Sequence, residues 1–520
     1  MSGRIWTGDE LTEDRVITCD VCVVGSGAGG GVLGHELARR GLDVVMLEEG
    51  GYRTRRDFDM KEATAYPAMY QELANRATDD LAISILQGRT VGGGTTVNWC
   101  ASFRTPPEIL ERWRDVHGVK GLDAATLAPH WDWLEERLHI RDWPIERANR
   151  NNQLLWDGLG KLGYSRGTVK RNVKDCASLG ACGLGCPTDA KQSMLVTLIP
   201  DAVEQGMRLF ANVSARRLEL EGMRVVAVHA DVLDPRTDRP TGRRLTVKPK
   251  VTAVCGGAIN SPALLLRSGL TARGLVGKRF FLHPVVVSTG RFRDRVEAFF
   301  GAPLSVYSRQ FIDRGPGKLG WLIEVPPIHP VLASVTTPGF GATHQALMEK
   351  LPFANAILSI TLDGVQPGDD GGTVSLRGEG EYTRLRVDYP LKPFHWEGFR
   401  EALKVAARLQ VAAGAVEVIS PHSTPVVMHS EQDVALLDRA PYAPLLCRVA
   451  SAHQMGGCAM GGSPKTSVVD STLRYWDADN LFVVDGSVFP TALGVNPMQT
   501  ILGLAHWGSQ HVAAAVGGRS

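Results

Sequence analysis

The sequence predicts an α/β protein of two domains, in which one domain is assembled from separated segments and the other is inserted between them. Three observations support this fold class. The 520 residues exceed what a single hydrophobic core usually holds. A strand–turn–helix–strand unit stands at the start of the chain. A strand, a turn and a helix return at its end, after a mixed stretch with many Pro and Gly turns.

The first unit begins with a short apolar run at residues 17–24, rich in β-branched side chains, which predicts a buried strand. The turn Gly25-Ser-Gly-Ala-Gly-Gly follows and opens an amphipathic helix that stops at Gly41. Residues 44–47 form the next apolar run, and Glu48 closes it. Strand, helix and strand in this order predict a parallel pair joined by a crossover helix.

The turn in this unit predicts a dinucleotide site. Gly25, Gly27 and Gly30 have the spacing that lets the backbone approach a pyrophosphate, and Ala28 lies where the helix begins. The helix N-terminus supplies free N–H groups. Glu48 follows the glycines at the spacing, about 20 residues, of the acid that accepts hydrogen bonds from the adenosine ribose. The pattern does not by itself distinguish FAD from NAD.

Other segments extend this organisation. Residues 108–142 have a helical, Trp-bearing pattern, and residues 397–413 form a long amphipathic helix. A final helix begins at Pro497, a residue favoured in the first turn. Strands are expected within residues 201–234, at 251–255, at 356–362 and at 481–484.

The composition is that of an ordinary globular protein, with 44% hydrophobic and 22% charged residues. A net charge of +2 gives no electrostatic reason to expect nucleic acid as a partner. There is no apolar run of about 18 residues, so no transmembrane segment is expected. The first residues lack the apolar region of a secretory signal. The compartment these features indicate is the cytoplasm, with a peripheral association with a membrane left open.

Three further motifs carry a family resemblance. Gly88-Arg-Thr-Val-Gly-Gly-Gly-Thr-Thr-Val-Asn98 resembles the first signature of the glucose–methanol–choline (GMC) flavoprotein family, and residues 257–269 resemble the second. Residues 453–458, 480–490 and 494–498 resemble the catalytic block of that family. With the glycine turn, the motifs follow the family's order along nearly the whole chain. The chain is identified as a member, nearest in its motifs to the cholesterol oxidase and long-chain fatty alcohol oxidase-like branches.

The resemblance implies FAD as the cofactor and a specific domain organisation. We expect a Rossmann-like FAD-binding domain of discontinuous segments, with an inserted α+β substrate domain built on an antiparallel sheet. The FAD-binding domain is predicted to comprise residues 1–104, 195–290 and 445–520. The substrate-binding domain is predicted to comprise residues 105–194 and 291–444.

The resemblance also implies which residues contact FAD. Beyond the glycine turn and Glu48, these are Arg89, Gly93, Thr95, Asn98, Val213, Asp485, Gly486, Pro497 and Met498. Members that hold the flavin covalently can have a His immediately before the Asn of the first signature. Val97 stands in that position here, so we expect non-covalent FAD.

The expected reaction is oxidation of a CH–OH group to an aldehyde or ketone, by proton abstraction and hydride transfer to flavin N5. By resemblance His453 is the base, because an imidazole commonly serves this role. Asn496 takes the position of a second active-site His found in other members, and its amide would orient the hydroxyl. His283 is interpreted as structural or flavin-adjacent. A hydrophobic long-chain or sterol-like alcohol is the expected substrate.

Cys176, Cys182 and Cys186 lie in a Gly-rich loop, and two interpretations stay open for them. They could hold a 3Fe–4S cluster, as in sugar dehydrogenases of the family that are linked to membranes. They could instead belong to a structural loop like that of the long-chain fatty alcohol oxidase-like members. A cluster would pass electrons to a quinone or a redox protein, whereas without one O2 is the expected acceptor.

Three alternative functions follow from the same motifs. One is a sugar or polyol dehydrogenase that passes electrons through an iron–sulfur cluster. A second is a flavin-bearing lyase of the same fold, because fold does not determine function. The third is a flavin-binding electron-transfer or structural protein without substrate turnover.

Overall fold

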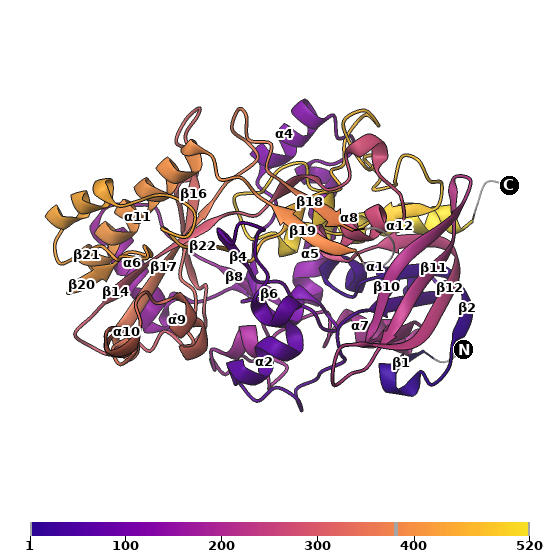
Figure 1. Cartoon of the computed structure of the whole chain (residues 1–520), viewed down its shortest axis with the longest axis horizontal. Coiled ribbons are helices and arrows are strands. Elements are labelled where there is room, and N and C mark those ends of the chain that lie inside the picture. Colours follow the sequence, from indigo (N-terminus) through magenta and orange to yellow (C-terminus); the bar gives the residue numbers. More distant parts are fainter. Residues whose placement is uncertain (1–2, 379–382, 518–520) are drawn as a thin grey trace.

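The structure is a computed structural model that describes residues 3–378 and 383–517 (Figure 1). Residues 1–2, 379–382 and 518–520, which belong to three of the predicted domain segments, lie outside the described residues. Two large sheets occupy opposite ends of the long axis, the first on the right of Figure 1 and the second on the left. Both ends of the chain lie beside the first sheet.

The first sheet has eight strands in the order β1-β9-β3-β2-β12-β11-β10, and β24 also pairs with β12. Its strands run parallel from β1 to β12 and at β24, whereas β11 is antiparallel to both of its neighbours, β10 and β12. The strands are β1 (Arg4–Trp6), β2 (Arg15–Val24), β3 (Val44–Glu48), β9 (Arg208–Ala211), β10 (Val213–Glu221), β11 (Arg224–Leu233), β12 (Pro240–Val254) and β24 (Leu481–Val483).

The register of this sheet joins distant parts of the chain. Residues 21–24 of β2 lie opposite residues 44–47 of β3 on one side and residues 251–254 of β12 on the other. Residues 481–483 of β24 pair with the end of β12. These apolar runs are buried, as is typical of parallel strands with both faces covered. The sheet is therefore built from three separated segments, which confirms the predicted fold class.

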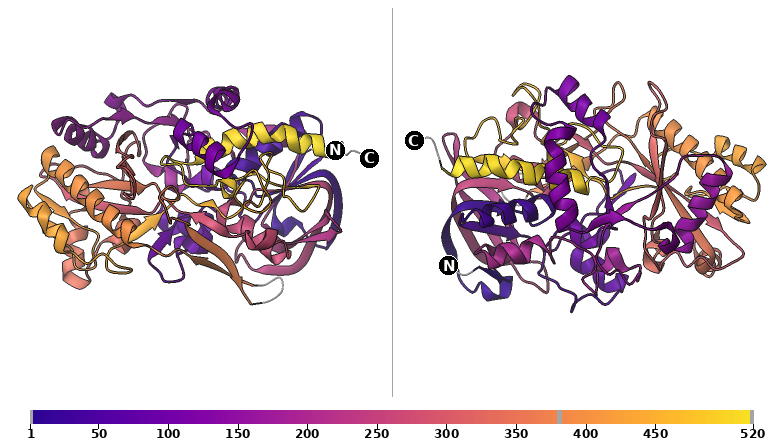
Figure 2. Two further views of the ribbon diagram at one scale, coloured as in Figure 1. Left: turned by 90° about the horizontal axis from the view of Figure 1, so that it is seen from above. Right: turned by 180° about the vertical axis from the view of Figure 1, so that it is seen from behind.

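Helices cover the first sheet. The helix of the glycine turn, α1 (Ala28–Arg39), packs against α7 (Leu198–Glu204) and against the last helix, α12 (Met498–Val516). Figure 2 shows α12, in yellow, running beside the indigo α1. On the antiparallel side, α8 (Gly257–Arg267) packs against β10. The N-terminal helix α1 and the C-terminal helix α12 thus lie in one layer of helices.

The second sheet has nine strands in the order β21-β20-β14-β17-β16-β15-β7, with β22 pairing with β14 and with β4. Its pairs are antiparallel except the β22–β4 pair, as expected for the substrate domain. Its strands are β4 (Ile83–Ile85), β7 (Gly167–Thr168), β14 (Val285–Arg291), β15 (Val306–Phe311), β16 (Trp321–Glu324), β17 (Ala354–Thr361), β20 (Glu417–Ile419), β21 (Val427–Met428) and β22 (Val449–Ser451).

Two smaller sheets and the remaining helices complete the fold around the two large sheets. One small sheet has the order β19-β18-β13-β23 and the other the order β5-β8-β6. Their strands are β5 (Ala101–Ser102), β6 (Ile140–Asp142), β8 (Lys170–Asn172), β13 (Lys278–Phe281), β18 (Gly372–Arg377), β19 (Arg384–Asp388) and β23 (Met455–Gly456). The other helices are α2 (Glu62–Met69), α3 (Gly94–Val97), α4 (Pro107–His117), α5 (Ala124–Arg137), α6 (Arg150–Lys161), α9 (Pro330–Thr336), α10 (Gly341–Met348) and α11 (Pro393–Ala413).

Two sequence expectations differ from the observed elements. The helical stretch expected over 108–142 is two helices and a strand, because Gly118 ends α4 in the left-handed region, with φ of 68°, and Asp123 caps α5 through a bond from Thr126 N. The amphipathic helix α11 begins at Pro393 rather than at residue 397, since proline is well suited to the first turn.

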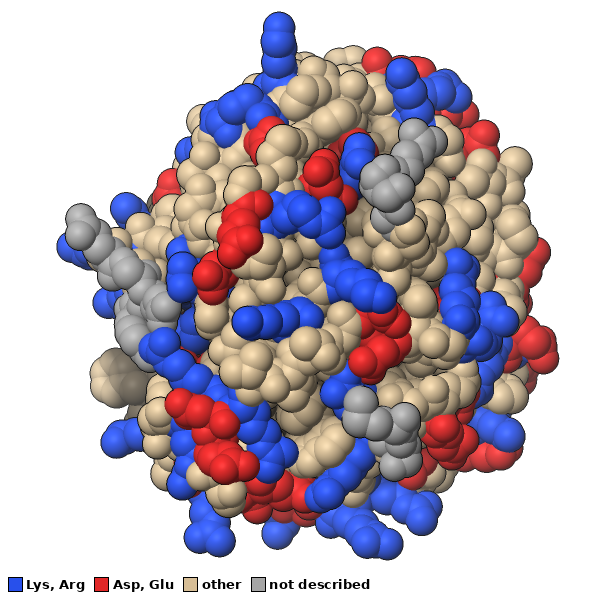
Figure 3. Space-filling model, turned by 90° about the vertical axis from the view of Figure 1, so that its right-hand side faces the viewer, with Lys and Arg blue, Asp and Glu red and all other residues tan. Residues whose placement is uncertain are grey.

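The buried apolar side chains form two main clusters. The larger one surrounds the first sheet, and the other lies between the second sheet and the helices α6 and α11. The predicted substrate segment 105–194 contributes to both: Trp113 of α4 belongs to the larger cluster, and Leu155 of α6 to the other. The exact domain limits stay a prediction. On the face shown in Figure 3, basic and acidic side chains are interspersed.

Candidate active site

A cavity of about 400 Å³ lies between the two large sheets. The turns at the carboxyl ends of β2, β12 and β24 line it from one side. Side chains of the second sheet, among them Val285, Glu324 and Ile360, line it from the other. Ligands of open α/β sheets bind at this edge, where the strand ends leave a crevice.

The glycine turn lines this cavity with Gly25, Gly27 and Ala28. Gly25 has φ of 104°, and a Cβ there would lie 2.4 Å from Cys255 O, so this position requires glycine. Gly30 does not line the cavity. Its role is packing, because a Cβ on Gly30 would lie 1.9 Å from Gly25 O. The turn thus presents bare backbone to a ligand, as the fingerprint predicts.

Glu48 is buried at the end of β3 and lines the cavity. Its Oε2 accepts hydrogen bonds from Ser26 N at 3.0 Å and Ser26 Oγ at 2.6 Å, and its Oε1 accepts one from Gly50 N at 2.8 Å. Ser26 Oγ in turn accepts a bond from Gly92 N at 3.0 Å, which ties the two glycine turns together. Burial raises the pKa of Glu48. Sequence analysis missed Ser26, although it lies between two fingerprint glycines.

The first signature lies directly opposite the fingerprint. A Cβ on Gly93 would lie 2.7 Å from Gly27 Cα, so the two turns approach backbone to backbone. Thr95 and Asn98 line the cavity, and Asn98 Nδ2 contacts Met498 Sδ at 2.9 Å. Thr95 Oγ1 donates to Gly92 O at 2.6 Å and so stabilises the turn itself.

Arg89 is the predicted FAD contact that the structure directs elsewhere. It is not among the residues that line the cavity within the described chain. Its guanidinium instead pairs with Glu49 at 3.0 Å and with Asp238 at 2.8 Å. Its contact with FAD stays a prediction.

Asp485 organises the end of β24. Its Oδ2 accepts hydrogen bonds from Gly257 N at 2.8 Å and Ser261 Oγ at 2.5 Å, while its Oδ1 accepts one from Ser487 N at 2.8 Å. The carboxyl thereby joins the second signature to the C-terminal block. The other predicted FAD contacts that line the cavity from this part of the molecule are Val213, Gly486, Pro497 and Met498.

The predicted catalytic pair lies together at the cavity. His453 Nε2 is 3.4 Å from Asn496 Nδ2, and Asn496 Nδ2 also donates to Glu324 Oε2 at 3.1 Å. Desolvation lowers the pKa of His453 to about 4 and raises that of Glu324 to about 8, the latter against the hydrogen bond from Asn496. Glu324 Oε1 and Asn496 Oδ1 are buried and accept no hydrogen bond from the described residues. Both oxygens can therefore accept a hydrogen bond from a ligand.

His283 determines how the His453 ring is oriented. Its Nε2 accepts hydrogen bonds from Leu493 N at 3.1 Å and Gly494 N at 2.9 Å. The neutral ring of His283 consequently carries its proton on Nδ1, which lies 3.2 Å from His453 Nδ1. His453 accepts at Nδ1, so its own proton is on Nε2; Asn496 Nδ2, itself a donor, then lies 3.4 Å from this nitrogen as a contact and not as a hydrogen bond. His283, interpreted from the sequence as structural or flavin-adjacent, is thus in direct contact with the predicted base.

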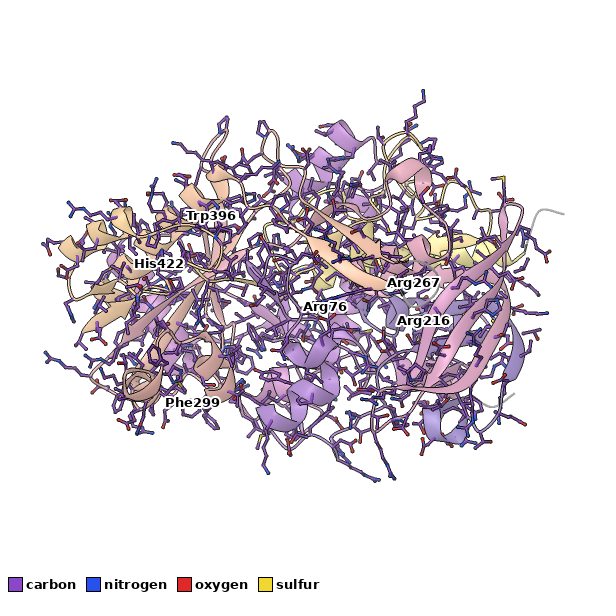
Figure 4. The ribbon with its side chains drawn as sticks, in the orientation of Figure 1. Arg76, Arg216, Arg267, Phe299, Trp396 and His422 are labelled. Carbon is purple, nitrogen blue, oxygen red and sulfur yellow. The ribbon has the colours of Figure 1, made fainter. Side chains whose placement is uncertain are left out.

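Sequence analysis missed Glu324 and three arginines. The signal for Glu324 is a single acid at the end of a buried apolar run, Trp321-Leu-Ile-Glu324. The arginines, Arg76, Arg216 and Arg267, line the cavity, and Arg216 and Arg267 lie near each other (Figure 4). Burial, helped by the charge of Arg216, lowers the pKa of Arg267 to about 10.

The cysteine loop lies apart from this cavity, beside Phe299 of Figure 4, whose carbonyl would be 2.4 Å from a Cβ on Gly180. Its three thiols have different partners: Cys176 Sγ meets Ser178 N at 3.4 Å, Cys182 Sγ meets Arg171 Nη2 at 3.6 Å, and Cys186 Sγ meets Thr188 Oγ1 at 3.5 Å.

These thiols do not form a metal site. Across residues 3–378 and 383–517, no three or more His, Cys, Asp or Glu side chains are grouped so that they could hold a metal ion. The predicted iron–sulfur cluster is therefore not supported. Within the same residues, no helix has the length and apolarity needed to cross a bilayer.

The fold is α/β, with a cavity at the carboxyl edge of its parallel sheet where ligands of such sheets bind. The models of the GMC oxidoreductase family match residues 24–285 with the N-terminal part and residues 367–505 with the C-terminal part. The chain belongs to the GMC oxidoreductase family and is an FAD-dependent oxidoreductase.

Individual relatives agree with this assignment. The chain is 31% identical to a long-chain-alcohol oxidase of Arabidopsis thaliana, over 94% of this chain and 68% of that protein. It is 34% identical to an uncharacterized GMC-type oxidoreductase of Mycobacterium tuberculosis, over 97% of this chain and 77% of that protein.

Solved structures share the fold. Pyridoxine 4-oxidase from Mesorbium loti superposes with a TM-score of 0.70 at 20% identity, covering 95% of this chain and 99% of that one. Formate oxidase of Aspergillus oryzae superposes with a TM-score of 0.70 at 14% identity, covering 97% and 99%.

Proposed function

We propose that this enzyme oxidises a hydrophobic alcohol to an aldehyde or ketone in the cavity between the two sheets. The observation that carries the proposal is a set of unsatisfied groups: Glu324 Oε1 and Asn496 Oδ1 are buried acceptors without a donor among the described residues, and the Asn496 amide joins Glu324 to His453. A hydroxyl group donates one hydrogen bond and accepts others, so it complements this set.

The cavity also suits a non-covalently held FAD. The backbones of Gly27 and Gly93 approach so closely that a side chain on Gly93 would fill the space between them. The first turn of α1 has free N–H groups at this point, which favour a pyrophosphate. Glu48 keeps acceptor capacity for a ribose, because a carboxylate has about four lone-pair positions and three hydrogen bonds are made here. When bound, the flavin supplies the group that accepts the hydride.

Two residues are candidates for the group that takes the hydroxyl proton. The sequence favours His453, but the contact from His283 leaves the proton of His453 on Nε2, where it donates a hydrogen bond to the substrate oxygen. Glu324 has the more suitable pKa, raised to about 8 and so close to the working pH. We therefore assign proton acceptance to Glu324, and hydrogen bonding of the oxygen to His453 and Asn496.

The wall opposite the glycine turns favours an apolar substrate. Val285, Leu304, Leu358 and Ile360 line it, and they belong to or flank the strands of the second sheet. Apolar walls with a few converging polar groups at one end bind a chain or ring system that ends in a hydroxyl. The relative from Arabidopsis thaliana, a long-chain-alcohol oxidase, supports a long-chain primary alcohol over a sterol.

The test is to mix the purified flavoprotein with alcohols in the absence of oxygen. We expect a long-chain primary alcohol to bleach the absorption of the oxidised flavin, and a polyol of similar size to leave it unchanged. Admission of O2 should then restore the spectrum with formation of hydrogen peroxide. Bleaching by the polyol alone would refute the apolar substrate. Cleavage of a substrate without any change of the flavin spectrum would refute alcohol oxidation in favour of a lyase.

A further inference from the structure

A second group of reactive side chains lies outside the substrate cavity, behind the turn that ends at Asn98. The thiol of Cys182, in a short 3₁₀ turn at residues 181–184, lies near Cys100, because Ala101 pairs with Arg171 across β5 and β8 and Arg171 Nη2 is 3.6 Å from Cys182 Sγ. Cys100 is fully buried and has φ of 70°, a left-handed conformation that side chains other than glycine rarely adopt. The two sulfurs thus come together from distant parts of the chain.

Two buried cations surround this pair. Arg171 of β8 is fully buried, with Nη2 at 3.6 Å from Cys182 Sγ and Nη1 bonded to Pro303 O. Lys191 is 3% exposed, and its Nζ donates to Cys182 O at 2.6 Å and to Asn98 O at 3.1 Å. Within the described ranges 3–378 and 383–517, neither cation forms an ion pair with a carboxylate. Backbone carbonyl oxygens bind both cations, Thr96 O being a third acceptor for Lys191, and burial lowers the pKa of Lys191. The acidic groups that act on both cations include the thiols of Cys100 and Cys182.

We propose that Cys182 is a peroxide-reactive thiolate and that Cys100 is the thiol that resolves its oxidised form. In the first step the Cys182 sulfur attacks one oxygen of hydrogen peroxide: an S–O bond forms, the O–O bond breaks, and hydroxide leaves and takes up a proton. In the second step the Cys100 sulfur attacks the sulfenic sulfur, an S–S bond forms and water leaves. Two thiols and one peroxide give one disulfide and two water molecules.

Access and hydrogen bonding support this assignment. Cys182 is partly exposed and lines a small cavity of about 20 Å³ together with Cys176 and Cys186, so a small oxidant has a path to it. Arg171 Nε is buried and donates to no partner in the described chain.

The electrostatics act in the same direction. The hydrogen bond from Cys100, together with the charges of Arg171 and Lys191, lowers the pKa of Cys182 to about 5 against the effect of burial. Burial raises the pKa of Cys176, which lies in the same loop and serves as an internal comparison. Thiolates react and thiols do not, so the three cysteines of the loop should differ sharply in rate.

The first experiment needs no variant. The intact flavoprotein is treated at neutral pH with a limiting amount of iodoacetamide, and peptide mass spectrometry follows each cysteine. We expect Cys182 to be alkylated about tenfold faster than Cys176 or Cys186. Equal rates at the three positions, or faster reaction at Cys176, would overturn the proposal.

The second experiment tests the chemistry. Wild-type protein exposed to hydrogen peroxide should yield a Cys100–Cys182 disulfide, found as a cross-linked peptide before reduction. In the Cys100→Ser variant the disulfide cannot form, and Cys182 should instead be trapped as a sulfenic acid by dimedone. Cys186→Ser is the matched control and should still form the Cys100–Cys182 disulfide. If wild-type protein forms disulfides only among the loop cysteines, Cys100 is not the resolving thiol and the proposal fails.

Discussion

The substrate cavity and the thiol cluster, which consists of Cys100, Cys182, Arg171 and Lys191, each bury an acidic group, but the pKa of that group shifts in opposite directions. In the cavity, Glu324 is desolvated with an amide as its partner, and its pKa rises to about 8. In the cluster, Cys182 is hydrogen-bonded to a second thiol and flanked by two cations, and its pKa falls to about 5. Burial by itself therefore does not determine protonation; the charge and hydrogen bonding of the neighbours do. The substrate cavity holds a carboxyl group whose pKa is close to neutral pH, and the thiol cluster holds a thiol that is ionised at neutral pH.

The largest expected effect concerns the proton acceptor. We predict that Glu324→Gln slows anaerobic flavin reduction by about 1000-fold while FAD stays bound, because the amide cannot take up the hydroxyl proton. Stopped-flow absorbance of the flavin measures the rate. Glu349→Gln, a change at the exposed residue that follows α10, is the matched control. A rate in Glu324→Gln close to that of the wild type would remove Glu324 from this role.

His453 is expected to contribute less, because it donates a hydrogen bond rather than accepting the proton. His453→Ala should slow flavin reduction by about 100-fold. His453→Gln, which keeps an N–H group near the same place, should recover to within about tenfold of the wild type. If Gln is as slow as Ala, the imidazole itself is needed and His453 is the base that the sequence predicts.

The pH dependence separates the same two assignments. Glu324 must be ionised to accept a proton, so the rate of flavin reduction should rise about tenfold per pH unit below 8 and level off above it. His453, with a pKa of about 4, is already neutral throughout this range and predicts a flat profile. The profile is measured by stopped flow between pH 6 and 9. A wild-type rate that does not change with pH would favour His453.

In the thiol cluster, removal of one cation should reduce the fraction of Cys182 that is ionised at neutral pH. Lys191→Met is predicted to slow alkylation of Cys182 at neutral pH by about tenfold, because the thiolate loses a nearby positive charge. Lys174→Met, at an exposed position of the same segment, is the control. Circular dichroism confirms that the variant is folded. An unchanged rate in a folded Lys191→Met protein would contradict the role given to the cation.

The smallest effect is expected at a predicted FAD contact that does not line the cavity. Arg89→Gln should weaken FAD binding by less than about fivefold, since a partly exposed ion pair contributes about 1 kcal/mol or less. Gly93→Ala should weaken it much more, because the added Cβ would meet Gly27 Cα at 2.7 Å. Equilibrium titration of the apoprotein with FAD compares the two. Equal losses would show that Arg89 matters as much as a residue of the cavity wall.

Local patterns predicted most of the cofactor side of the cavity. Glycine spacing, β-branched runs and a strand-terminal acid depend on neighbours within about 30 residues, so they can be recognised along the chain. The positions of Gly25, Gly27, Glu48 and Gly93 at one sheet edge agree with this expectation. Arg89 differs because ion pairs with Glu49 and Asp238 compete for its guanidinium.

The sequence by itself determined that this chain is a flavoprotein of the GMC family with a Rossmann-like domain in separated segments. Short motifs in a fixed order along the chain carry those features. Only the tertiary structure decided which side chains share an environment. It brought Glu324 from β16 to Asn496 and His453, and it gave the three loop cysteines different partners while placing Cys182 near Cys100. The physical reason is that protonation and reactivity depend on burial and on neighbours from distant segments, which no spacing along the chain records.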